Sequence, residues 1–79
     1  MGANQLDKII RYLSVPDSYL TSRNALLLLG IYRLAARIHD LEQKGYEFGR
    51  EWDSYTDSEG HTERYIKYTL KYTPYEVRE

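Results

Sequence analysis

Two arginines one helical turn apart are the residues of this sequence best suited to recognise a specific ligand. Arg33 and Arg37 lie in residues 31–44, whose apolar residues recur at helical spacing. A guanidinium group donates two parallel hydrogen bonds to a guanine edge, and it pairs equally well with phosphate. Ala36, on the same outward face, is small enough for a helix that enters a groove about 12 Å wide. This spacing indicates a nucleic-acid contact, although a solvated helix face has the same charges.

Further polar and basic residues flank this pair. Tyr32 can hydrogen-bond to a phosphate or pack against a thymine methyl group. Residues 21–23 begin the preceding helical segment, where free backbone N–H groups favour phosphate. We therefore predict DNA contacts from Thr21, Ser22, Arg23, Tyr32, Arg33, Ala36, Arg37 and Lys44, with further contacts from Arg64, Lys67 and Lys71 of a hairpin.

The composition argues against catalysis. The 79 residues include no cysteine, which excludes disulfides, thiol catalysis and zinc ribbons. His39 and His61 are the two histidines, and neither has a partner at metal-ligand spacing. The sequence has no glycine-rich phosphate loop and no G-x-S-x-G motif. We predict no enzyme activity, no metal site and no cofactor.

Helical periodicity predicts three helices in the first half of the chain. The first covers residues 4–14 and ends before Pro16, which cannot extend a helix. The second covers residues 22–29 and ends at Gly30, a residue type that readily adopts the left-handed conformation after a helix. The third covers residues 32–44. Its expected inward face consists of Ile31, Leu34, Ile38 and Leu41.

After residue 45 the apolar period falls to two, the period of a β-strand. Residues 46–56 and 62–72 alternate in this way, and the polar DSEGH between them is typical of a hairpin turn. Gly49 is a candidate β-bulge, and residues 73–79 form a tail. The order predicts an α+β fold, a three-helix winged helix-turn-helix with a C-terminal two-stranded β-hairpin wing, in one domain over residues 1–79.

The predicted hairpin is rich in tyrosine and acidic residues. Residues 46–62 contain one basic and five acidic residues, so their net charge is 1 − 5 = −4. A tip of this charge repels a phosphate backbone, whereas exposed tyrosines are common at protein interfaces. We expect core-covering rings at Tyr46, Trp52, Tyr68 and Tyr72, and outward rings at Tyr55, Tyr65 and Tyr75.

The sequence TSRNALLLLGIYRLAARIHDLEQKGYEF, together with Trp52 and the later RYIKYTL, resembles the small phage and prophage helix-turn-helix family. The resemblance covers residues 4–72, and Phe48 stands where the family usually has an aliphatic residue. It implies a winged-helix fold and DNA binding. The matching positions are Ala25, Gly30, Ile31, Ala36, Arg37, Ile38, Leu41, Gly45 and Tyr46.

Two functional hypotheses follow. The first is a small phage or prophage transcriptional regulator that binds double-stranded DNA through its third helix. Because the net charge of the chain is only −1, useful affinity would require a homodimer on paired half-sites. The second hypothesis is a protein-interaction module that uses the acidic, tyrosine-rich hairpin. We expect a cytoplasmic protein with no membrane contact, since the apolar run at residues 26–29 is far shorter than the about 20 residues of a span.

Overall fold

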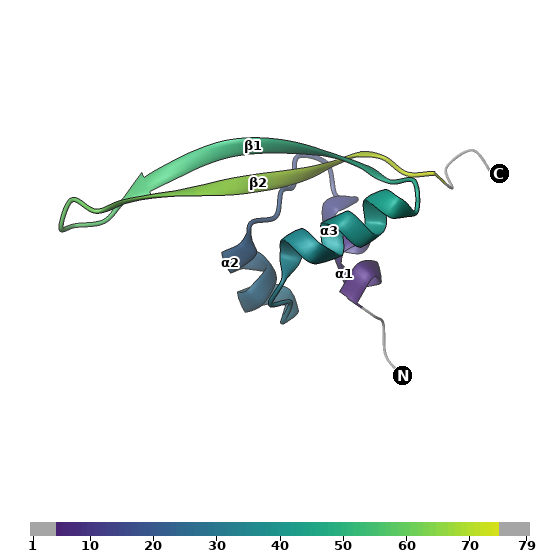
Figure 1. The fold of residues 1–79 in the computed structure, drawn as a ribbon, viewed down its shortest axis with the longest axis horizontal. Coiled ribbons are helices and arrows are strands. Elements are labelled where there is room, and N and C mark those ends of the chain that lie inside the picture. The colour runs from purple at the N-terminus through teal and green to yellow at the C-terminus, as the bar shows by residue number, and fades with distance from the viewer. Residues whose placement is uncertain (1–4, 75–79) are drawn as a thin grey trace.

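A long antiparallel hairpin covers one side of a small group of helices in the computed structural model, which describes residues 5–74 (Figure 1). Along the chain lie α1 (Gln5–Leu13), α2 (Ser22–Asn24), η1 (Ala25–Leu29), α3 (Leu34–Gln43), β1 (Glu47–Thr56) and β2 (Thr62–Tyr72). The segments α2 and η1 are continuous, so three helical segments precede the hairpin. The predicted α+β winged-helix class is therefore confirmed. Tyr75 and most of the predicted tail lie outside the described residues.

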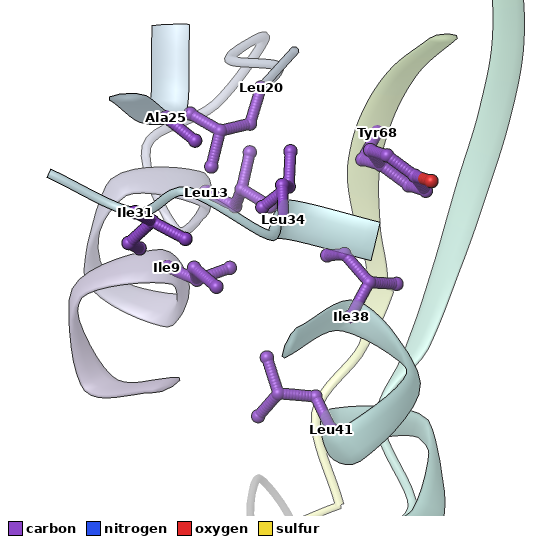
Figure 2. Close-up of a cluster of buried hydrophobic side chains, with 9 residues drawn as sticks. All are labelled: Ile9, Leu13, Leu20, Ala25, Ile31, Leu34, Ile38, Leu41 and Tyr68. Carbon is purple, nitrogen blue, oxygen red and sulfur yellow. The ribbon is translucent and has the colours of Figure 1, made fainter. Parts of the chain in front are cut away.

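The core forms where the inner faces of α1 and α3 meet the underside of β2. Ile9 and Leu13 of α1 belong to one buried cluster with Leu34, Ile38 and Leu41 of α3 (Figure 2). Apolar burial of this kind stabilises a folded domain by roughly 25 cal/mol per Å² removed from water. The predicted inward face of the third helix is confirmed. The buried hydrophobic residues are Ile9, Leu13, Leu20, Ala25, Ile31, Leu34, Ile38, Leu41 and Tyr68.

The second helical segment begins with a side-chain cap and widens before it ends. The Asn24 backbone N–H donates to Thr21 Oγ1 at 3.1 Å, which satisfies an otherwise free donor of the first turn. Residues Ala25–Leu29 form a π-helical turn, a geometry that is uncommon and occurs mainly as single turns. Gly30 then adopts a left-handed conformation with φ of 70°, which a side chain would disfavour. The turn places Ile31 in the core, where it is fully buried.

The third helix begins at Leu34, two residues later than predicted. Tyr32 lies in the turn, and Arg33 is the residue before the first helical turn, with φ −123° and ψ 69°. Ile31 matches the helical spacing of Leu34 and Ile38, but the turn itself buries it. Because the turn buries Ile31 at a helical spacing, the sequence pattern alone places the first residue of the helix two residues too early. The helix ends at Gln43, followed by Lys44 and Gly45 in a turn.

The two strands of the hairpin pair in register from Phe48↔Leu70 to Thr56↔Thr62. Leu20 adds an isolated β-bridge to β2, because its N–H and C=O both bond to the backbone of Tyr68, at 2.9 and 2.8 Å. The irregularity predicted at Gly49 lies instead between Glu47 and Phe48. Gly49 has a different role, since a Cβ there would lie 2.6 Å from Lys71 Cε and 2.8 Å from Thr69 Oγ1.

The aromatic residues divide between core and surface differently from the prediction. Tyr68 is buried, and Tyr46 is half-buried against the core as expected. Trp52 and Tyr72, also expected to cover the core, are 60% and 43% exposed. Both share the strand face of Tyr68, but the helices cover only part of the hairpin (Figure 1). Tyr55 is exposed as predicted, whereas Tyr65, also predicted to face outward, is half-buried.

Candidate nucleic-acid interface

The outward face of α3 is narrow, polar and accessible. Leu34, Ile38 and Leu41 hold the opposite face in the core. Ala35 and Gln43 are exposed, and Ala36 is half-buried. Because two small alanines stand in the first turns, little side-chain bulk separates the helix backbone from an approaching surface. This geometry matches the space that a major groove offers a helix.

Arg33 and Arg37, predicted as equivalent contacts, differ in their surroundings. Arg33 is exposed at the start of α3, and within residues 5–74 no carboxylate lies within ion-pair distance of it. Arg37 is half-buried, and its Nε donates to Asp40 Oδ2 at 3.0 Å. The bond uses Nε and leaves the two terminal Nη groups of Arg37 outside this ion pair. Arg33 is therefore free to contact a ligand. A ligand that contacts Arg37 also comes close to the Asp40 carboxylate, because the two side chains are paired.

The start of α2 contains two further predicted contacts, and these line a depression together with Tyr32, which precedes α3. Ser22 and Arg23 are exposed at the helix start, next to its first backbone N–H groups. Thr21, also predicted to contact phosphate, is only 7% exposed, and its hydroxyl oxygen accepts the capping hydrogen bond. Thr21 therefore positions this end of α2, while Ser22 and Arg23 are the accessible residues.

The sequence between Asp17 and Asp40 contains three arginines and no acidic residue. It covers α2, η1, the turn and the first half of α3. These residues therefore carry a net positive charge, although the chain as a whole has a net charge of −1 and Glu63 of β2 lines a pocket together with Arg23. A local positive field of this kind attracts a polyanion to one side of a molecule.

Of the three basic residues predicted on the hairpin, two contact other residues of the hairpin region. The Arg64 guanidinium lies 4.8 Å from the centre of the Trp52 ring. Lys67 pairs with Asp53 at 3.3 Å and lies 4.7 Å above the Tyr19 ring. The hydrogen bond to Asp53 raises the pKa of the Lys67 ammonium above its ordinary value. Lys71 is exposed near the base of the hairpin.

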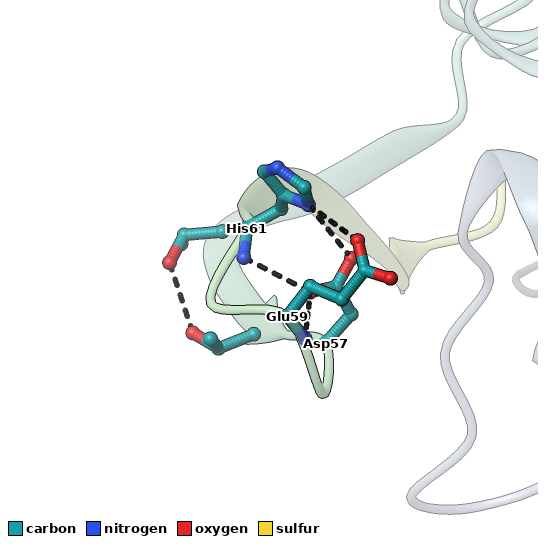
Figure 3. Close-up of polar contacts among 5 residues, drawn as sticks. Asp57, Glu59 and His61 are labelled. Atoms are coloured by element: carbon teal, nitrogen blue, oxygen red, sulfur yellow. Dashed lines mark hydrogen bonds and ion pairs between the residues drawn. The ribbon is translucent and has the colours of Figure 1, made fainter.

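The hairpin tip has ordered acidic groups. Asp57 Oδ1 accepts hydrogen bonds from the backbone N–H groups of His61 and Glu59, each at 2.9 Å (Figure 3). The His61 N–H is the main cause that lowers the pKa of the Asp57 carboxyl. His61 Nδ1 lies 3.4 Å from Asp57 Oδ2. Among the described residues, no group of three or more His, Cys, Asp or Glu side chains is suited to hold a metal ion.

A bidentate ion pair connects α3 to the hairpin. Arg50 Nη1 and Nη2 of β1 donate to the two carboxylate oxygens of Glu42, at 2.9 and 3.2 Å. The same guanidinium lies 5.3 Å from the centre of the buried Tyr68 ring. The hydrogen bond from Arg50 is the main cause that holds the pKa of Glu42 below its ordinary value of 4.5. This contact fixes the end of α3 relative to β1.

Breaking this ion pair is expected to lower the free energy of unfolding by an amount that depends on pH. Folding lowers the pKa of Glu42 below its unfolded value near 4.5. The pair therefore contributes its full stabilisation above that unfolded pKa. This stabilisation disappears as the pH falls through the lower pKa of the folded state. Glu42→Gln should lower the free energy of unfolding by about 0.2–1 kcal/mol at neutral pH, the usual value for a solvent-accessible pair. Urea denaturation across the acid range should show the difference from the wild type disappearing at low pH. Glu47→Gln is the control. An equal loss of the free energy of unfolding in both variants, independent of pH, would contradict a stabilising ion pair between Glu42 and Arg50.

Two exposed side chains of α3 were not among the predicted contacts. His39 and Gln43 are exposed one turn apart, and Gln43 Nε2 lies 3.4 Å from His39 Nε2. Together with Ala35 they form a row at four-residue spacing on the outward side of the helix. A glutamine side chain can make bidentate contact with an adenine edge. The four-residue spacing of this row is visible in the sequence and could have identified both residues.

Comparison with known proteins agrees with this architecture. A family model described as a winged helix-turn-helix domain matches residues 4–72. No curated protein and no solved structure matches the chain. Within residues 5–74, the helices are too short or too polar to cross a membrane.

Proposed function

The chain belongs to the winged helix-turn-helix domain family, and from this premise we propose that it binds double-stranded DNA with α3 in the major groove. The observation that carries the proposal is the outward face of α3, where Arg33 is exposed and accessible beside two alanines. In this proposal the protein is a small transcriptional regulator of phage or prophage genes that acts in the bacterial cytoplasm.

The contacts divide between base edges and phosphates. Arg33 and Arg37 donate to guanine edges, and Gln43 contacts an adenine edge further along α3. Ser22 and Arg23 at the start of α2 contact the phosphate backbone and set the angle of approach. Lys44, exposed just beyond the end of α3, adds a phosphate contact. Thr21 and Lys67 act indirectly, because both are already bonded within the protein.

The hairpin contributes little to DNA affinity in this proposal. Its tip contains Asp57 and Glu59, which repel phosphate. Arg64 and Lys71 are its remaining candidate contacts. Because the cationic surface is small, we propose that two copies bind paired half-sites about 34 Å apart, or at a multiple of that distance.

Selection from a library of random duplexes tests this function. We expect an enriched, two-fold symmetric site whose affinity falls linearly with salt on logarithmic axes, by a slope of about 0.9 for each neutralised phosphate. The titration is done by mobility shift between about 50 mM and 200 mM salt. Recovery of random sequences, or affinity independent of salt, would exclude sequence-specific duplex binding.

A protein partner for the hairpin is a second candidate function. The observation that favours it is the exposure of Trp52 and Tyr55, 60% and 48%, on a hairpin whose sequence is acidic. Exposed aromatic rings are often the anchors of protein interfaces. Such contacts are far less sensitive to salt than phosphate contacts, so the same salt series separates the two functions.

A further inference from the structure

An apolar depression lies beside the start of α3. Its volume is about 370 Å³, and its lining is mainly apolar. Leu27 and Tyr32 are 71% and 81% exposed, and Leu26 is 41% exposed. Exposed apolar side chains that gather in one place usually mark a binding surface. The residues that line the depression are Ser22, Arg23, Leu26, Leu27 and Tyr32.

The position of the depression connects it to the proposed DNA contacts. Tyr32 directly precedes Arg33, the exposed arginine at the start of α3. Ser22 and Arg23, the proposed phosphate contacts, line it together with Tyr32. A duplex bound by Arg33, Ser22 and Arg23 would therefore lie against the depression. The group that fills it must be apolar and must lie close to phosphates.

The charge around the depression selects among possible occupants. None of the five residues that line the depression is acidic, and Arg23 is one of them. If a second copy docked through the same surface, the two Arg23 side chains would approach each other across an apolar contact. A polyanion with an apolar group on its edge avoids this repulsion.

DNA has one such group in the major groove, the C5-methyl group of thymine. We propose that Leu26, Leu27 and Tyr32 receive one or more thymine methyl groups and so select T·A base pairs beside the bases contacted by Arg33. This inference rests on the proposed function, because it requires α3 to lie in the major groove. It adds selection of T·A base pairs beside the start of α3, whereas the adenine contact proposed for Gln43 lies at the other end of the helix.

Replacing thymine by deoxyuridine tests the proposal, since it removes only the methyl group. The wild-type chain is titrated by mobility shift with the selected duplex and with copies in which thymines are replaced one at a time. We expect the wild type to lose about fourfold in affinity for each methyl group that the depression buries. Leu27→Ala should bind more weakly and lose most of this sensitivity to deoxyuridine.

Leu28→Ala is the matched control for Leu27→Ala. Leu28 is the next residue, is 60% exposed and does not line the depression, so its variant should discriminate thymine from deoxyuridine as the wild type does. Salt-dependent, sequence-specific binding with no response to any deoxyuridine, or a selected site without thymine, overturns the thymine proposal but leaves the proposed function intact. Absence of duplex binding overturns both. A change of self-association in Leu27→Ala, with unchanged thymine discrimination, assigns the depression to a second copy and also overturns the proposal.

Discussion

Replacing Arg33 and Arg37 together by alanine is expected to weaken binding to the selected duplex by at least about 30-fold. A bidentate arginine–guanine contact contributes about 1–3 kcal/mol, so two contacts contribute about 2–6 kcal/mol. Arg33 is the accessible member of the pair, and its loss removes a direct contact. Loss of Arg37 also frees the Asp40 carboxylate, which then lies unneutralised near the bound DNA. Mobility shift with both single variants and the double variant measures the separate effects.

Arg11→Ala is the control for each single variant, because it also removes one positive charge, from an exposed position of α1. It should reduce affinity only slightly, through long-range electrostatics. Circular dichroism should show all the variants folded, since neither Arg33 nor Arg37 belongs to the buried core. If the double variant binds the selected site as tightly as Arg11→Ala does, the outward face of α3 is not the contact surface.

Leu34→Ala is expected to have the largest effect on stability. Leu34 is 1% exposed in the core between α1 and α3, and truncation of such a leucine costs about 2–5 kcal/mol. Small domains are stable by only about 5–15 kcal/mol, so the variant should be strongly destabilised. Chemical denaturation followed by circular dichroism gives the free energy of unfolding.

Leu28→Ala is the same chemical change on the surface. Because Leu28 is 60% exposed, its truncation should change the free energy of unfolding by no more than about 0.5 kcal/mol. A similar loss in the two variants would mean that α3 is not held by the core described for Leu34.

The buried face of α3 could be predicted because its residues recur at one period. Leu34, Ile38 and Leu41 are inward as the spacing requires. The same pattern could not locate the first residue of the helix, since Ile31 is buried by the turn after Gly30. Periodicity reports which residues are buried, but a turn can bury a residue at helical spacing without a helix.

The hairpin shows a related limit. Alternation assigned Trp52 to the face of Tyr68 correctly, since Trp52 pairs with Ile66 and Arg50 pairs with Tyr68. It could not show that the helices cover only part of that face, which leaves Trp52 exposed. Strand parity defines a face, whereas the extent of the core depends on how the helices pack against it.

Which residues form ion pairs around the candidate nucleic-acid interface also depends on the fold. Glu42 and Arg50 are eight residues apart and meet only because β1 turns back after α3. Asp40 is at helical spacing from Arg37, yet the sequence alone does not show which of its neighbours it pairs with. As a result, the sequence could suggest candidate contacts, but it could not show which of them are accessible in the fold.

Amide chemical shifts of the isotope-labelled full chain, recorded while the selected duplex is added, test most directly whether α3 is the DNA-binding element. If α3 enters the major groove, the largest changes occur at residues 22–23 and 32–44, with small changes at the hairpin tip. Changes concentrated around Trp52, Tyr55 and the acidic turn, with α3 unaffected, would contradict it.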